Sequence, residues 1–241
     1  MIKVMSVFGT RPEAIKMAPL VKELERRPEI ESIVCVTAQH RQMLDQVLET
    51  FDITPDYDLN IMKPGQTLSG ITSNALLGLE TVIKEAQPDI VLVHGDTTTT
   101  FAGALAAFYN QVAIGHVEAG LRTDNKYSPF PEEMNRQMVD RMTDMFFAPT
   151  DVSKENLLRE NIDPAKIYVT GNTVIDAMST TVKEDYTHPE LEWLGEGERM
   201  ILLTAHRREN LGEPMHRIFR GVRRIVEEFP DVKVIYPIHM N

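Results

Sequence analysis

The sequence predicts an α/β protein built on a doubly wound parallel sheet. Short runs rich in β-branched residues alternate along the chain with segments of helical periodicity, which is the order of a βαβ series. Two of these runs end in Gly, His and a carboxylate, and ligands bind at that end of parallel strands. With 241 residues, 42% of them hydrophobic, the chain can bury one sizeable core or two modest ones.

Eight strands and the helices between them follow from these patterns. The apolar runs span residues 2–8, 32–37, 89–93, 112–117, 145–148, 167–170, 200–204 and 232–236. One helical face is formed by Leu68, Ile71, Ala75, Leu79, Val82 and Ile83, and another by Met215, Ile218, Phe219, Val222, Ile225, Val226 and Phe229. Because helical segments separate most of the strands, we expect the strands to run parallel.

A domain boundary is expected at residues 171–172. The first six strands would complete one Rossmann-like domain, 1–171, and residues 172–241 would begin a second one. Residues 184–198 are acidic and contain both Gly and Pro, so we expect them to form an exposed connection. Only two strands follow this connection, which is too few for an independent α/β domain. We therefore expect the second domain to be incomplete in this chain.

Charge and cysteine content exclude several classes of protein. A net charge of −11 argues against bulk binding to nucleic acid or to an anionic membrane, because either would be repelled at long range. Cys35, the single cysteine, has apolar neighbours and is expected in the core, so neither a disulfide nor a thiolate metal site is expected. There is no leader pattern and no apolar run near the roughly 20 residues of a spanning helix. These features predict a cytoplasmic enzyme.

The first candidate site follows the first strand, at residues 9–16. Gly9 permits a tight turn and Pro12 suits the start of a helix, whose free N–H groups and partial positive charge attract an anion. Arg11 and Lys16 would add full charges. The glycine spacings of a dinucleotide fingerprint and of a Walker loop are absent. An ordinary strand-to-helix turn with two solvated cations is the alternative.

The second candidate site combines the ends of the third and fourth strands. His94 and Asp96 lie two residues apart, as do His116 and Glu118, so each pair shares one face if the stretch stays extended. Acid/base chemistry is the preferred interpretation, and a metal site is the weaker alternative because no further ligand is evident. Thr97 begins a threonine run that would cap the next helix, and capping is the alternative role for Asp96.

Two further constellations carry candidate residues. Glu132 and Glu133 open a helix whose dipole favours their charge. Glu132 is the better candidate for reaching a substrate, and Arg136, one turn on, can orient it or pair with it. His206 and Arg207 follow the seventh strand, where Arg can bind a phosphate bidentately and imidazole can exchange a proton, although a His in such a loop is usually a surface residue.

Together these motifs resemble one enzyme family closely. The strings are GTRPEAIKMAPL from Gly9, HGDTTTT from His94, HVEAGLRT from His116, SPFPEEMNRQ from Ser128, VTGNTVID from Val169 and TAHRREN from Thr204. In this order they resemble the nonhydrolysing UDP-N-acetylglucosamine 2-epimerases of bacteria, and the similarity runs from Met1 to Asn241. The resemblance implies two Rossmann-like domains arranged as in B-type glycosyltransferases, with the active site in the cleft between them.

The resemblance also implies a reaction and its residues. Family members interconvert UDP-GlcNAc and UDP-ManNAc by eliminating UDP and adding it back, with no cofactor and no metal, usually to supply envelope polysaccharide synthesis. The positions that match the family's catalytic residues are Asp96, Glu118, Glu132 and His206. Arg11 and Lys16 match its binding residues, and Arg136 and Arg207 complete the expected substrate-binding set. A homodimer is expected for the full-length protein.

A regulatory site is implied as well, because bacterial members commonly bind a second UDP-GlcNAc as an activator. The matching positions are Gln39, Gln42, Met43 and Gln66, together with Glu132 and Arg207. Gly65 stands where some relatives have an arginine, which puts one ionic contact of that site in doubt.

Four alternatives to a working epimerase remain open. Most uridine and diphosphate contacts of the family lie beyond residue 241, so a chain of this length is expected to bind UDP poorly and to turn over slowly or not at all. A hydrolysing relative would release free ManNAc. A glycosyltransferase would pass the sugar to an acceptor, which the clustered carboxylates disfavour. A noncatalytic sugar-nucleotide sensor is the alternative from a different class.

Overall fold

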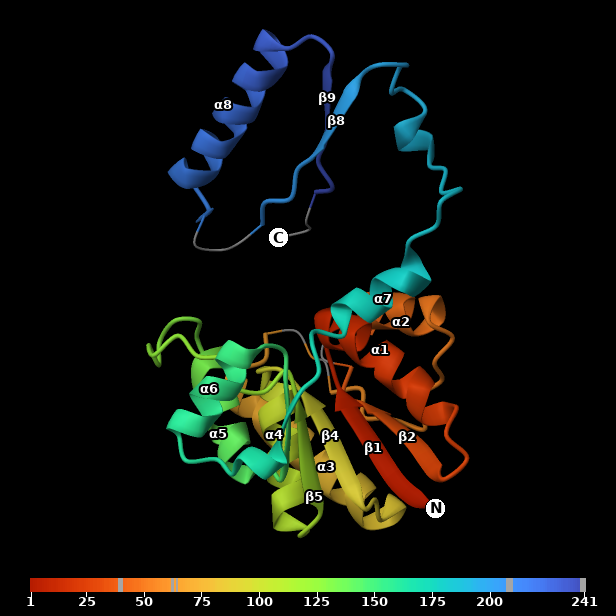
Figure 1. Ribbon diagram of the computed structural model, residues 1–241, viewed down its shortest axis with the longest axis vertical. Coiled ribbons are helices and arrows are strands. Elements are labelled where there is room, and N and C mark those ends of the chain that lie inside the picture. The colour runs from red at the N-terminus through yellow and green to blue at the C-terminus, as the bar shows by residue number, and fades with distance from the viewer. Residues whose placement is uncertain (39–40, 62, 64, 207–209, 239–241) are drawn as a thin grey trace. The chain divides into compact units, whose positions relative to one another are not determined.

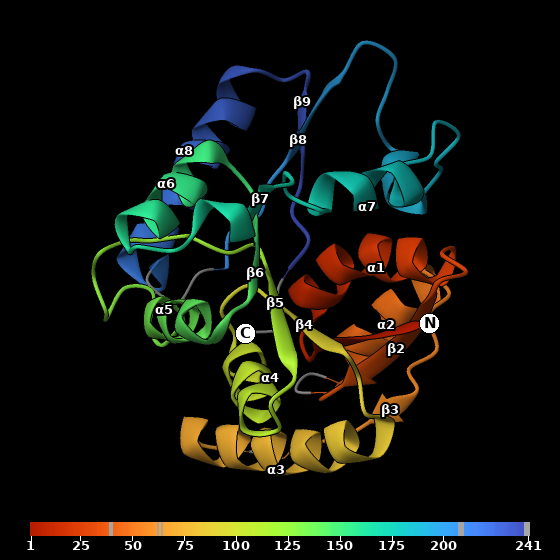
Figure 2. The same ribbon diagram turned by 60° about the horizontal axis from the view of Figure 1, so that its bottom comes forward.

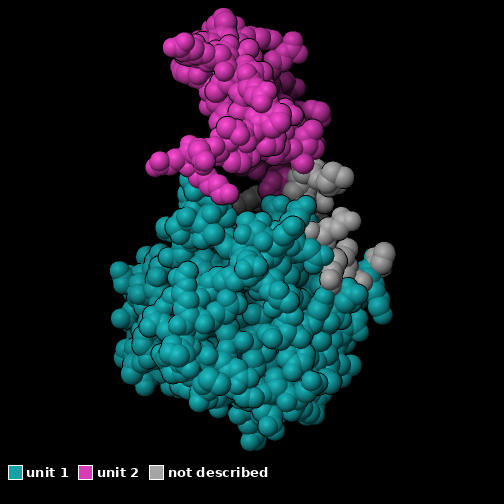
Figure 3. Space-filling view, turned by 90° about the vertical axis from the view of Figure 1, so that its right-hand side faces the viewer, with its two compact units in different colours: residues 1–182 teal, residues 183–241 magenta. Residues whose placement is uncertain are grey.

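The computed structural model describes residues 1–38, 41–61, 63, 65–206 and 210–238. The chain divides into two compact units, residues 1–182 and residues 183–241, which Figure 3 shows in different colours. Among the described residues, no helix is both long and apolar enough to cross a membrane.

A seven-stranded parallel sheet forms the first unit, in the order β3-β2-β1-β4-β5-β6-β7. Its strands are β1 (Ile2–Phe8), β2 (Ile30–Val36), β3 (Tyr57–Asp58), β4 (Ile90–His94), β5 (Ala113–Val117), β6 (Met145–Ala148) and β7 (Ile167–Val169). The chain moves outward in one direction from β1 and then in the other from β4, so the order reverses between these two strands. In open α/β sheets the crevice beyond the carboxyl ends at this reversal is where ligands bind.

Helices cover both faces of this sheet (Figures 1 and 2). They are α1 (Arg11–Glu25), α2 (Arg41–Thr50), α3 (Leu68–Ala86), α4 (Thr98–Tyr109), α5 (Glu132–Met142), α6 (Asp151–Arg159) and α7 (Val174–Thr181). Helices α3 and α4 pack with β1, β4 and β5 in one apolar cluster, in which Met5, Leu79 and Val93 are buried. Helices α1 and α2 pack on the opposite face, where Phe8 and Met17 are buried.

Alternation of side chains along the strands explains why both faces are covered. In β1, Met5 and Val7 contribute to the cluster with α3 and α4, whereas Val4 and Phe8 contribute to the cluster with α1 and α2. A continuous apolar run is what a strand buried on both faces requires. Cys35 is buried in the first cluster, as expected, and burial raises the pKa of its thiol to about 12.

The α/β class and the parallel sheet predicted from the sequence are confirmed. The short β3 was not predicted, because its two residues carry no periodic pattern. Helix α7 follows the expected boundary at residues 171–172, but it packs against α1 within the first unit. The compact units thus meet at residues 182–183, and the domain boundary at 171–172 stays a prediction.

The second unit contains a two-stranded parallel sheet of β8 (Arg199–Leu202) and β9 (Val232–Ile235), with α8 (Glu213–Glu228) between them in sequence. A short 3-10 helix, Pro189–Leu191, lies in the connection before β8, and another, Pro164–Lys166, precedes β7 in the first unit. Val232 is the only buried hydrophobic residue among the described residues of this unit, and none of the residues of α8 is buried.

Candidate active site

Hydrogen bonds of Glu13 connect the turn after β1 with the turn after β4. Its carboxylate accepts hydrogen bonds from the backbone N–H of Gly9 (3.1 Å) and Thr10 (2.7 Å), and from the Thr97 hydroxyl (2.7 Å). Burial raises the pKa of Glu13, although these hydrogen bonds oppose the shift. A side chain at Gly9 would lie 2.0 Å from Oγ1 of Thr37, so only glycine fits this close approach.

Lys16 and Glu118 meet above the carboxyl ends of β1 and β5. Nζ of Lys16 donates a hydrogen bond to Oε2 of Glu118 at 2.6 Å, and Nδ2 of Asn172 donates to the same oxygen at 2.8 Å. Glu118 has φ +68°, the left-handed region that non-glycine residues rarely occupy. Strain of this kind persists where surrounding contacts fix it, and it is frequent at functional sites.

Asp96 lies in the turn between β4 and α4. The helix is capped by Thr97, whose side chain accepts a hydrogen bond from the N–H of Thr100, so the threonine run caps the helix as predicted and Asp96 is not the cap. Nη1 of Arg136 lies 3.5 Å from Oδ2 of Asp96, and Nδ2 of Asn135 donates to the Asp96 carbonyl at 2.9 Å. The side chain of Asp96 therefore faces α5.

Burial and neighbouring charged side chains shift the pKa of Asp96. Burial raises this pKa, the Arg136 guanidinium opposes the rise, and the negative charges of Glu132 and Glu118 increase it further. The charges of Glu118, in the turn after β5, and of Glu132, at the start of α5, thus act on Asp96, in the turn after β4. Carboxylates that crowd together in a partly desolvated site are suited to holding and releasing protons near neutral pH.

Helix α5 contributes Glu132 and Arg136, in a different pairing from the one expected. The ion pairs of Arg136 join it to Glu133, with Nε donating to Oε2 at 2.9 Å, and to Asp96. Glu133 is buried and also accepts hydrogen bonds from the backbone N–H of Thr123 at 3.1 Å. Oε2 of Glu132 is buried and has no hydrogen-bond partner among the described residues.

The two histidines do not share a face with the neighbouring carboxylates. Strands β4 and β5 end at His94 and Val117, so Asp96 and Glu118 lie in turns beyond them. His116 is buried; its Nδ1 is 2.6 Å from Oδ1 of Asp140 and its Nε2 is 2.7 Å from the Gly95 carbonyl. Both ring nitrogens are therefore used, which removes a ligand from the metal alternative.

His94 is buried beside Glu118, and its Nε2 lies 3.7 Å from Oε2 of that carboxylate. Neither ring nitrogen of His94 has a hydrogen-bond partner among the described residues. Burial lowers the pKa of His94 to about 4, although the charge of Glu118 opposes the shift. The imidazole is therefore neutral at neutral pH.

The other predicted site residues lie on α1 and α2, in the loop before α3, in the second unit, or outside the described part of the chain. Arg11 is exposed at the start of α1, and His206 is exposed in the second unit, after β8. Gln66 folds onto its own loop and donates to the Ile61 carbonyl at 2.8 Å, and Met43 is 36% exposed. Gln39, Arg207 and the side chain of Gln42 lie outside the described residues. Their expected roles stay predictions.

Three contributors to the site were not predicted from the sequence. They are Glu13, Asn135 and Asn172, whose partners are 84, 39 and 54 residues away in the chain. No sequence spacing could pair such residues. Each lies inside a string quoted for the family resemblance, however, and Glu13 follows the Thr10 N-cap by three residues, which is the spacing of a capping box.

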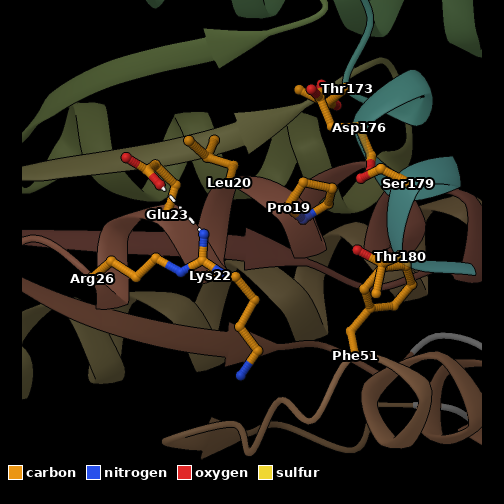
Figure 4. A pocket seen from close by; sticks show the side chains of 10 residues that line it. All are labelled: Pro19, Leu20, Lys22, Glu23, Arg26, Phe51, Thr173, Asp176, Ser179 and Thr180. Carbon is orange, nitrogen blue, oxygen red and sulfur yellow. Dashed lines mark hydrogen bonds and ion pairs between the residues drawn. The ribbon is translucent and has the colours of Figure 1, made fainter.

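A groove of about 610 Å³ is lined by side chains of α1 and α7 and by Phe51 (Figure 4). Its lining consists of Pro19, Leu20, Lys22, Glu23, Arg26, Phe51, Thr173, Asp176, Ser179 and Thr180. None of the predicted site residues is among them. The contacts of Glu13, Asp96 and Glu118 lie instead in the turns at the carboxyl ends of the strands.

Known proteins resemble the chain over its whole length. A Bacillus subtilis UDP-N-acetylglucosamine 2-epimerase is 68% identical over 240 residues, covering 100% of this chain and 63% of the relative. A structure of S. aureus MnaA with UDP has a TM-score of 0.92 at 57% identity, and covers 100% of this chain and 64% of its own. The chain thus spans about 63% of the length of the B. subtilis relative.

A second structure carries a sugar nucleotide. The Neisseria meningitidis UDP-GlcNAc 2-epimerase bound to UDP-GlcNAc has a TM-score of 0.92 at 51% identity, and the alignment covers 100% of this chain and 67% of that one. The sequence model of the family described as UDP-N-acetylglucosamine 2-epimerase matches residues 22–241. The chain belongs to the UDP-N-acetylglucosamine 2-epimerase family.

Proposed function

We propose that the protein interconverts UDP-GlcNAc and UDP-ManNAc by eliminating UDP and adding it back, without net hydrolysis. The observation that carries this proposal is that the charges of Glu118 and Glu132 act on Asp96 in the turn after β4, beside the reversal of strand order, while Lys16 lies 2.6 Å from Glu118. The relative from N. meningitidis was solved with UDP-GlcNAc, which supports this substrate.

The chemistry explains why carboxylates are needed. C2 of the sugar has no neighbouring carbonyl, so simple enolisation cannot invert it. A base must remove the C2 proton while the C1–O bond breaks and its electron pair leaves with UDP, giving 2-acetamidoglucal. UDP then bonds again to C1 while a proton is delivered to C2 from the other face. Two proton-carrying groups on opposite faces of the ring satisfy this sequence.

We assign the proton-donating role in re-addition to Asp96, because its raised pKa favours the protonated form. Glu118 and Glu132 are then the candidates for removing the C2 proton. Lys16 and the N-terminus of α1 would stabilise the charge that develops on departing UDP, since cations and free N–H groups there attract phosphate.

A second nucleotide sugar as activator remains part of the proposal. Met43, which is 36% exposed, Gln66 and Glu132 are described residues among those assigned to that regulatory site. A sigmoid dependence of initial rate on UDP-GlcNAc concentration in the native protein is the expected result, and a hyperbolic dependence would count against activation.

Deuterated water separates the proposed reaction from its alternatives. The native protein is incubated with UDP-GlcNAc in D₂O and the sugar is followed by NMR. We expect deuterium at C2 in both UDP-GlcNAc and UDP-ManNAc, with the nucleotide retained. Free ManNAc with released UDP would indicate a hydrolysing enzyme. Intact C2–H with transfer to an added acceptor would indicate a glycosyltransferase, and no change at all would indicate a binding protein.

A further inference from the structure

One buried pair of side chains connects the three segments that carry the carboxylates. His116 and Asp140 are joined at 2.6 Å, and the side chains of both are fully buried. The other ring nitrogen of His116 bonds to the carbonyl of Gly95, the residue before Asp96. His116 lies two residues before Glu118, near the carboxyl end of β5.

Asp140 holds the other flank of Glu118. Its Oδ2 accepts a hydrogen bond from the backbone N–H of Gly120 (3.3 Å) and another from Nη2 of Arg122 (2.7 Å). Asp140 therefore contacts residues on both sides of Glu118. These contacts restrain the backbone of Glu118 at its left-handed φ of +68°. Asp140 lies on α5, the helix that begins with Glu132.

The charge balance keeps this arrangement in place. Burial disfavours the ionised carboxyl of Asp140, but His116 and Arg122 more than offset this, and the pKa of Asp140 is lowered. Arg122 is anchored in turn by Glu160 on the far side, with Nε donating to Oε1 at 2.6 Å. The carboxylate is therefore charged and fully partnered, which gives a rigid connection.

We propose that His116 and Asp140 are positioning residues for the reaction: their buried contact sets the distances among Asp96, Glu118 and Glu132. The pair touches no reacting atom, and it acts through the turns that it joins. This inference rests on the proposed function. It predicts that breaking the pair lowers the rate of the chemical step more than it lowers substrate binding, because misplacing a catalytic group by about 1 Å can reduce the rate on the order of 100-fold.

The test compares three variants of the native protein. Asp140→Ala removes all three contacts, whereas Asp140→Asn can keep them, because its amide can donate to His116 and its oxygen can accept from Gly120 and Arg122. Asp144→Ala is the matched control, since Asp144 accepts from the N–H of Ile114 at the opposite end of β5 (3.0 Å).

For Asp140→Ala we expect kcat to fall roughly 10- to 100-fold while KM changes less than about threefold. Asp140→Asn should recover most of the loss, and Asp144→Ala should lower thermal stability without lowering kcat. If Asp140→Ala does not fold, His116→Gln replaces it, because glutamine can keep the bond to Gly95 and loses the one to Asp140. A kcat equal to that of Asp144→Ala in the folded variant would overturn the proposal.

Crystal structures of the same variants separate this proposal from the proposed function. The carboxylates of Asp96 and Glu118 should move by about 1 Å or more relative to each other in the variant that breaks the pair. If they keep their positions within about 0.5 Å, the proposal is overturned whatever the activity. A native protein that does not exchange C2–H contradicts the proposed function alone, and the coordinates then decide the positioning role.

Discussion

His94 is a buried neutral imidazole beside a carboxylate, and its state has a measurable consequence. Its pKa of about 4 in the folded protein lies below the value of 6.5 from which burial shifts it. As the pH falls below 6.5, the unfolded chain binds a proton at His94 and the folded protein does not. Folding stability is therefore lost between pH 6.5 and about 4, and this contribution is constant below that range.

His94→Gln should remove this part of the pH dependence. In the wild type the group can account for a loss of up to about 3 kcal/mol in the free energy of unfolding between pH 7 and pH 4. Urea denaturation at several pH values measures it. The same substitution at exposed His188 is the control for removing a histidine. Equal pH dependence in the wild type and in His94→Gln would show that His94 is not buried in the neutral form.

Pairings between distant residues mark the limit of what the sequence could predict. Asp96, Glu118 and Glu132 were selected because they follow strands or open a helix, and the charges of Glu118 and Glu132 raise the pKa of Asp96. Arg136 was expected to orient Glu132 or pair with it, and its ion pairs join it to Glu133 and Asp96, because only the fold places Asp96 beside α5.

At the scale of elements, the turns after β5 and β7 differ in how much space surrounds their glycines. Gly120 has φ +84°, and a Cβ there would lie 2.3 Å from the Ser153 carbonyl oxygen, so backbone and not a flexible side chain blocks it. Gly171 has a similar φ of +80°, but nothing lies within 4 Å of its Cβ position. A side chain at Gly120 would therefore meet both backbone strain and a steric clash, whereas a side chain at Gly171 would meet backbone strain alone.

Gly120→Ala should destabilise the protein by roughly 3 kcal/mol or more, because it adds a backbone collision to left-handed strain. Gly171→Ala should cost only about 1–2 kcal/mol, the strain alone. The free energy of unfolding in urea gives both values. Similar losses for the two variants would mean that the turn after β5 can shift away from α6, and would weaken the view that the Glu118 turn is rigid.

Strands and helices were predictable where a period was long enough to read. The face of α3 that carries Ile71, Ala75 and Leu79 is buried as predicted, because a helix of 19 residues repeats the pattern several times. Strand β3 has two residues and therefore no period. The start of β2 at Ile30 lies two residues before the predicted one, since polar Glu31 hides the edge of the strand.

For the whole molecule, the two units differ in how many hydrophobic side chains they bury. The first unit has apolar clusters on both faces of its sheet, whereas Val232 is the only buried hydrophobic residue among the described residues of the second. The segment joining α7 to β8 is largely exposed, with residues 182–190 all exposed. Protease sites in exposed segments without regular structure are cut first.

Limited digestion with a protease specific for glutamate should therefore cut the native chain first within residues 183–198. A resistant fragment close to residues 1–182 should accumulate and keep the circular dichroism of an α/β protein. Mass spectrometry of the early products identifies the cut. Early cleavage within α3 or α5, at a rate equal to that in 183–198, would contradict the division into two units.

The proposed function requires that Asp96, Glu118 and Glu132 act on the C2 proton of one sugar. Exchange of that hydrogen from D₂O into UDP-GlcNAc, measured by NMR for the native protein and for variants, tests it most directly. Asp96→Asn and Glu118→Gln should each slow exchange on the order of 100-fold or more, since each removes an acid/base group. Glu80→Gln, on the exposed face of α3, should exchange at the native rate. Unchanged exchange in the first two variants would contradict the claim.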